Sequence, residues 1–140
     1  MKTAFLNGIL LKDEQLYIEQ PAGFKVPRKE DWVFYLIKSI YGMKQASRVW
    51  NIMFNGTIMS WGFIHLSYEW CIYFKLSPSS TVIFSVHVDD IFATASSLAE
   101  MEAFKAFLQT KWKIADLRPA KFALGIAITR DSLSHIVSLS

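Results

Sequence analysis

Two adjacent carboxylates, Asp89 and Asp90, are the residues of this sequence best suited to chemistry. They interrupt an apolar stretch that runs over Val82–Thr94. At a separation of roughly 4 Å, two carboxylates repel each other by about 4 kcal/mol at an effective dielectric constant of ~20. A bound divalent cation would remove that repulsion. The pair is therefore either the tip of a tight turn, where Asp is well tolerated, or a turn that also holds a metal ion.

The residues before the pair alternate in polarity, which predicts a strand with one buried face. Phe84 and Val86 fall on the apolar face, whereas Asp89 falls on the more polar face with Ser85 and His87. A second apolar run follows the acids, so the stretch predicts a β-hairpin with both aspartates at its tip.

The elements around this hairpin follow from the same periodicities. Aromatic and aliphatic residues recur at three- and four-residue steps after Ala46, which predicts a helix that ends at Gly62. The spacing of Ser97 and Glu100 is that of a capping box and predicts the start of a second helix. Further strands are predicted over residues 16–19, 32–37, 71–76, 122–129 and 136–139. The layout is α+β, with helices packed on one face of a mainly antiparallel sheet.

Composition sets wider limits on the chain. Its 140 residues are 52% hydrophobic and carry a net charge of +3, enough for one domain or part of one. The apolar excess indicates a piece that further protein covers, and the weak basicity permits a nucleic-acid partner. Cys71 is the only cysteine, so an internal disulfide is excluded and a small buried hydrophobe is expected. Neither a signal peptide nor a membrane span is predicted.

Several segments, in this order, resemble the reverse transcriptase of copia-type LTR retrotransposons. They are Lys2–Gly8, Tyr17–Phe24, Lys38–Trp50, Val86–Asp90, Asp116-Leu117 and Leu124–Ile128. One such segment would carry little weight, because a pair of aspartates in a turn is common. Their joint occurrence in register covers essentially the whole chain.

The resemblance implies an RNA-directed DNA polymerase built of fingers, palm and thumb. Such an enzyme copies an RNA or DNA template-primer with deoxynucleoside triphosphates and two Mg²⁺ ions. It implies that Asp89 and Asp90 are catalytic and supply two of three metal-binding carboxylates. It also implies that the remainder of the retrotransposon polyprotein is a partner. The expected location is cytoplasmic, in a virus-like particle, with the nucleus as the alternative and no membrane association.

The third carboxylate of the family stands two residues before the lysine that matches Lys2. Met1 occupies the position between them, so the sequence is expected to lack this aspartate. By the same comparison, residues 1–140 are expected to be a partial domain, a palm with part of the fingers. The upstream fingers, the thumb and ribonuclease H are expected to be absent, and the isolated chain is expected to be inactive.

Six further residues take roles from the resemblance, each with a plainer alternative. Phe5 would lie beneath the sugar of the nucleotide and select against a 2′-hydroxyl, or is a core aromatic. Tyr41 and Gly42 would form the floor of the nucleotide pocket, or are merely a turn. The remaining three would contact nucleic acid, or are a solvated charged face and a strand bulge: Lys44, Arg48 and Gly125.

Departures from the family pattern include His87 for tyrosine and Arg118 for glycine, which suggest a sequence no longer held to polymerase function. His87 is expected to be a tolerated substitution rather than a metal ligand. Two other hypotheses remain. One is a non-enzymatic nucleic-acid-binding or interaction remnant. The other is a different two-metal palm enzyme, against which the segments Lys2–Gly8 and Tyr41–Gln45 argue.

Overall fold

The computed structural model describes residues 1–131, 133–134 and 136–140. Its elements run along the chain in the order η1 (Ala4–Asn7), β1 (Tyr17–Glu19), β2 (Val33–Tyr35), α1 (Ala46–Ser60), β3 (Ile64–His65), β4 (Ile72–Ser77), β5 (Ser80–His87), β6 (Asp90–Ala95), α2 (Leu98–Lys111), β7 (Phe122–Ala123), β8 (Ile126–Asp131) and β9 (Ile136–Leu139). These helices and antiparallel sheets confirm the α+β prediction.

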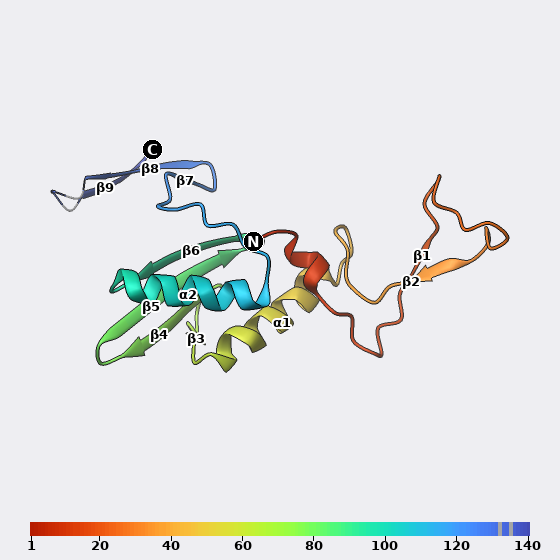
Figure 1. The fold of residues 1–140 in the computed structure, drawn as a ribbon, viewed down its shortest axis with the longest axis horizontal. Coiled ribbons are helices and arrows are strands. Elements are labelled where there is room, and N and C mark those ends of the chain that lie inside the picture. Colours follow the sequence, from red (N-terminus) through yellow and green to blue (C-terminus); the bar gives the residue numbers. More distant parts are fainter. Residues whose placement is uncertain (132, 135) are drawn as a thin grey trace.

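The central body is the four-stranded antiparallel sheet β3-β4-β5-β6 with both α-helices on one face (Figure 1). Tyr73 of β4 pairs with Phe84 of β5, so the two rings share a face. Phe54 of α1 meets Phe84 with ring centroids 6.3 Å apart, and Phe104 of α2 meets it at 4.9 Å. One sheet face therefore receives both helices, as predicted.

The start of α2 and the end of α1 each have a local cause. Glu100 donates its backbone N–H to the Ser97 Oγ at 3.2 Å, which caps α2 as the spacing predicted. Gly62 follows α1 with a φ of 88°, a left-handed conformation that stops a helix at little cost to glycine. Between these ends the apolar stripes of the helices, including Phe54 and Leu108, are buried.

The hairpin β5–β6 has its tip one residue earlier than predicted. His87 pairs with Asp90, so the turn consists of Val88 and Asp89, and Asp90 is already the first residue of β6. Val88 has a φ of 54°, which a β-branched residue rarely adopts. The alternation of polarity runs unbroken through Val88, and sequence periodicity therefore could not show where the turn begins.

The predicted strand over residues 122–129 is wrong. Leu124 and Gly125 form a turn between β7 and β8, with φ values of 49° and 87°. Two consecutive positive φ values are typical of a tight hairpin turn, so Gly125 marks a reversal rather than a bulge in a buried strand. The sheet β7-β8-β9 also includes the predicted strand at 136–139, and Phe122 and Leu124 are exposed.

An arm made of β1 and β2 projects from the side of the body opposite to the sheet β7-β8-β9 (Figure 1). Tyr17 pairs with Tyr35 and Ile18 with Phe34, and both strands are exposed throughout. The tip of the arm is held by Gln20, which is only 6% exposed. Its amide accepts from Val26 N at 2.8 Å and donates to the Trp32 carbonyl at 2.7 Å.

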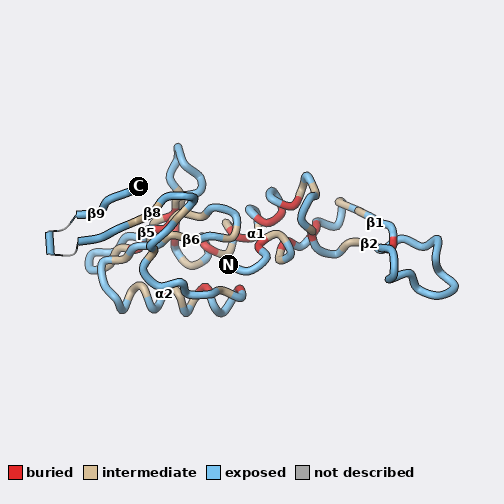
Figure 2. Tube along the Cα trace, turned by 90° about the horizontal axis from the view of Figure 1, so that it is seen from above, coloured by how far each residue is buried: buried red, intermediate tan, exposed pale blue. Residues whose placement is uncertain are grey.

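Burial is concentrated where η1, α1 and α2 meet the sheet, whereas the arm and the C-terminal sheet are mostly exposed (Figure 2). Cys71 was expected to be buried, but it lies exposed at the start of β4. The Glu69 carboxylate accepts a hydrogen bond from the Cys71 backbone N–H, in the turn that leads into β4. In the described part of the chain, no helix has both the length and the apolar character needed to cross a membrane.

Candidate metal and nucleotide site

Asp89 is the centre of a cluster built by segments that are far apart in the sequence. Its Oδ1 accepts a hydrogen bond from the Ala4 backbone N–H at 2.8 Å. The Tyr41 hydroxyl lies 3.2 Å from each oxygen of the same carboxylate. The Met1 ammonium donates to the Asp89 carbonyl oxygen. The β5–β6 turn, the N-terminal segment and the loop before α1 therefore converge on one half-buried carboxylate.

The backbone of η1 explains why Asp89 is held there. The segment begins at Ala4 after Thr3, whose own side chain caps nothing. A free N–H at the start of a helical turn favours a carboxylate as its acceptor, and Asp89 supplies one from across the fold. The half-burial of this side chain is therefore a consequence of its bond to Ala4.

Phe5 and Tyr41 lie together beside this carboxylate. Their ring centroids are 5.0 Å apart and the planes are tilted by 44°. Ser39, fully buried, donates its hydroxyl to the Phe5 carbonyl, and its N–H donates to the Gly8 carbonyl at 2.9 Å. These bonds fix the loop that carries Tyr41 against η1. The structure thus brings together three residues predicted as catalytic or nucleotide-binding.

The surroundings of Tyr41 raise the pKa of its phenol. Partial desolvation is the main cause, followed by the hydrogen bond to Asp89 and the negative charge of that carboxylate. The hydroxyl therefore stays protonated and keeps its role as a donor. Next to it, Gly42 has a φ of 90° and nothing within 4 Å of the position that a Cβ would take. A ligand could approach this backbone closely.

Asp90 is exposed and lies opposite His87 in the hairpin ladder. Carboxylate oxygens are the ligands that Mg²⁺ prefers, and adjacent Asp89 and Asp90 fit this ion in chemical type. The described residues nevertheless contain no cluster of three or more His, Cys, Asp or Glu side chains arranged to hold a metal. The described residues therefore do not form a complete metal site by themselves.

The three residues predicted to contact nucleic acid have different surroundings in the structure. Lys44 is exposed on the loop that leads into α1. Arg48, expected to touch phosphates, instead forms an ion pair with Glu14 from the segment between η1 and β1. Gly125 lies in the separate C-terminal sheet (Figure 1), and the structure does not bring it to Asp89.

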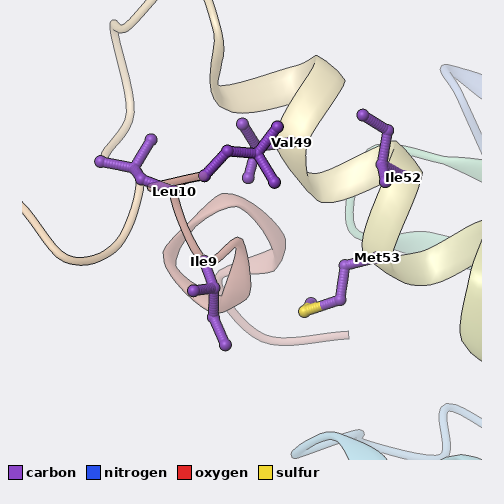
Figure 3. A pocket seen from close by; sticks show the side chains of 6 residues that line it. Ile9, Leu10, Val49, Ile52 and Met53 are labelled. Carbon is purple, nitrogen blue, oxygen red and sulfur yellow. The ribbon is translucent and has the colours of Figure 1, made fainter. Parts of the chain in front are cut away.

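Sequence reasoning missed Ser39, which anchors the Tyr41 loop, and the Ala4 N–H. A backbone donor leaves no signal in a sequence, and Ser39 stands in an ordinary Lys-Ser-Ile context. An apolar hollow of about 210 Å³ was also missed, formed by residues 9–11 against α1 (Figure 3). Its lining of Ile, Leu, Val and Met has no group that could bind or activate a phosphate, so it is distinct from the Asp89 cluster.

Comparison with known proteins decides the family. Residues 1–140 match the family described as "Reverse transcriptase (RNA-dependent DNA polymerase)". The chain belongs to the reverse transcriptase family. The resemblance to the copia-type enzymes predicted from the sequence is confirmed, because the related curated proteins come from transposons of that type.

Two relatives illustrate the match within this reverse transcriptase family. The retrovirus-related Pol polyprotein from transposon TNT 1-94 of Nicotiana tabacum is 36% identical over 100% of the chain, which spans 10% of that protein. The putative transposon Ty5-1 protein of Saccharomyces cerevisiae is 34% identical over 96% of the chain, which spans 43% of that protein. The chain thus covers less than half of either relative. No solved structure matches it.

Proposed function

We propose that this chain is the palm, with part of the fingers, of a retrotransposon RNA-directed DNA polymerase. In this proposal Asp89 and Asp90 are two of the carboxylates that hold the catalytic Mg²⁺ ions. Phe5, Tyr41 and Gly42 receive the deoxynucleoside triphosphate. The reaction is nucleotidyl transfer, in which a primer 3′-oxygen attacks the α-phosphate and pyrophosphate leaves.

The convergence on Asp89 is the observation that carries the proposal. Ala4 and Tyr41 are separated from Asp89 by 85 and 48 residues along the chain, and both bond to its carboxylate. A turn that served only to join β5 to β6 would not need these partners. Phe5 lies against Tyr41, so the proposed nucleotide residues border the proposed metal residues.

When bound, Mg²⁺ would supply activation of the attacking oxygen and stabilisation of charge on the leaving pyrophosphate. The chain's own contribution is to orient Asp89 through the Ala4 N–H and to present Asp90 at the start of β6. We propose that a further carboxylate from outside the described residues completes the set. With two clustered carboxylates rather than three, the isolated chain should bind the ion too weakly to polymerise.

The template-primer and the remainder of the polyprotein are the proposed partners. Lys44, exposed beside the Tyr41 loop, is positioned to contact a phosphate. The arm and the C-terminal sheet expose many apolar side chains, including Trp32 and Phe122, which further polyprotein would cover. The proposed location is the cytoplasm, in a virus-like particle.

A Mn²⁺ titration tests the metal assignment. Binding is measured as the loss of the electron paramagnetic resonance signal of free Mn²⁺. Asp89→Asn keeps an acceptor for the Ala4 N–H but removes the charge, so it should weaken Mn²⁺ binding at least tenfold. Asp13→Asn, an exposed aspartate on the segment before β1, is the matched control and should leave binding unchanged. Equal binding by the two variants would refute the assignment.

A chain extended by one Asp before Met1 tests the incomplete carboxylate set. The Met1 ammonium lies at the Asp89 carbonyl, so an added residue enters the structure beside the proposed metal ligands. The Asp extension should bind Mn²⁺ more tightly than a matched Asn extension. Robust Mg²⁺-dependent primer extension by the unextended chain would refute the proposal that it is inactive alone.

A non-enzymatic nucleic-acid-binding remnant is the competing function. It predicts salt-dependent RNA or DNA binding that is indifferent to Asp89→Asn and to divalent cations. The polymerase proposal predicts that Mg²⁺ strengthens template-primer binding in the presence of a complementary deoxynucleoside triphosphate. The dependence on Asp89 therefore separates the two functions.

A further inference from the structure

The Tyr41 hydroxyl occupies an unusual place on the Asp89 carboxylate. It lies 3.2 Å from Oδ1 and 3.2 Å from Oδ2, and thus spans both oxygens rather than bonding to one. Ala4 N already bonds to Oδ1 at 2.8 Å. In the described part of the chain, Oδ2 has the hydroxyl as its one hydrogen-bond partner.

This contact is weak by its geometry. Hydroxyl-to-oxygen hydrogen bonds in proteins have a typical length of about 2.7–2.8 Å, and bonds to charged acceptors are shorter still. A single proton shared between two oxygens at 3.2 Å satisfies neither of them fully. The carboxylate is therefore held by the Ala4 N–H and only covered by the phenol.

The phenol ring is exposed at the surface. Tyr41 is 47% exposed, and it is followed by Gly42, which has open space around it and a φ of 90°. A change in the side-chain torsions of Tyr41 would separate its hydroxyl from Asp89. Because the ring also rests on Phe5, the same movement would change the wall of the proposed nucleotide pocket.

We propose that the Tyr41 hydroxyl is a placeholder on Asp89, which covers both carboxylate oxygens while no cation is bound and gives way when a divalent cation binds. This inference rests on the proposed function, in which Asp89 is a metal ligand. Tyr41 is thereby a positioning residue that opposes cation binding and couples it to Phe5.

Tyr41→Phe in the full 140-residue chain tests the inference. It removes the competing hydroxyl and keeps the ring against Phe5, so Mn²⁺ should bind about three- to tenfold more tightly, the factor expected for one lost hydrogen bond. Tyr35→Phe is the matched control, because Tyr35 is an exposed tyrosine on the arm. It should leave Mn²⁺ affinity unchanged. Circular dichroism melting should show both variants folded.

A second measurement does not depend on affinity. Adding Mg²⁺ to the unchanged chain should perturb the ultraviolet absorption of a tyrosine, because a phenol loses its anionic neighbour. This difference spectrum should persist in Tyr35→Phe and vanish in Tyr41→Phe. Unchanged or weaker Mn²⁺ binding by Tyr41→Phe would overturn the placeholder role, since a residue that only orients Asp89 would aid binding.

The possible failures are distinguishable. If Asp89→Asn abolishes Mn²⁺ binding but Tyr41→Phe does not strengthen it, the placeholder is overturned and the metal assignment stands. If Asp89→Asn has no effect, or the chain binds no Mn²⁺ at millimolar concentration, the metal assignment is overturned and the placeholder with it.

Discussion

Gly8 lies where the N-terminal segment packs tightly against Ser39 and α1. A Cβ at this position would be 2.7 Å from the Ser39 Oγ and 3.1 Å from the Val49 Cγ1. Ser39 is fully buried and its hydroxyl bonds to the Phe5 carbonyl, so it cannot move without losing that partner. The absence of a side chain at Gly8 therefore keeps Phe5 and Tyr41 beside Asp89.

Gly8→Ala should lower the free energy of unfolding by about 1–3 kcal/mol, the usual cost of forcing atoms into a packed site. Gly56→Ala is the matched control, since Gly56 lies on the exposed side of α1 with nothing near its Cβ position. That change should instead stabilise the protein by about 0.5–1 kcal/mol. Urea denaturation checks both. Equal effects of the two substitutions would contradict the close packing at Gly8.

The arm is the element whose stability depends most on one side chain. Gln20→Leu would leave the Val26 N–H and the Trp32 carbonyl without their partner inside the arm. The Lys29 carbonyl would keep one of its two donors, the Trp32 N–H. Hydrogen exchange of residues 21–32 should quicken at least tenfold, while α2 keeps its protection. Gln109→Leu, on the exposed side of α2, should change neither region. Faster exchange in α2 would show that the arm and the body unfold together.

The segment after α2 is tied back to the helix by charge. Lys105 bonds to Asp116 at 3.0 Å. The Arg118 N–H, and next Lys105, lower the pKa of Asp116 below its ordinary value of 3.8. A lowered pKa in the folded state gives stability that is present above pH 3.8 and is lost as the pH falls through the folded value. Asp116→Asn should therefore flatten the acid limb of thermal stability, measured as the fall of the melting temperature with falling pH.

At the scale of the whole molecule, the net charge is +3. Any affinity for nucleic acid should therefore fall as the salt concentration rises. If Lys44 contacts a phosphate, Lys44→Ala should reduce the slope of log affinity against log salt by about 0.7 for single-stranded nucleic acid. Lys12→Ala, on the segment before β1, is the control and should leave the slope unchanged. Fluorescence anisotropy with a labelled oligonucleotide measures both. An unchanged slope for Lys44→Ala would remove this residue from the interface.

The predictable part of this molecule is the part governed by periodicity. The three- and four-residue spacing around Phe54 and the Ser97 cap located both helices, because each signal is local. The turn at Val88 was misplaced, because only its backbone φ reveals it. Tyr41 and Asp89 are 48 positions apart along the chain, and no local sequence pattern predicts a contact over such a separation. Resemblance named both residues, but only the fold shows that they touch.

The arm is linked to the body by two hydrogen-bonded segments of unequal length, residues 8–16 and residues 36–39. Ser39 pairs with Gly8 and Ile37 with Leu10, but the next pair joins Leu36 to Leu16. Leu36 and Ile37 are consecutive, whereas residues 11–15 separate Leu10 from Leu16 on the other segment. The Arg48–Glu14 ion pair joins these extra residues to α1. Loss of this ion pair would release residues 11–15 from α1. The arm would then be joined to the body through the pairs that Gly8 and Leu10 make with Ser39 and Ile37.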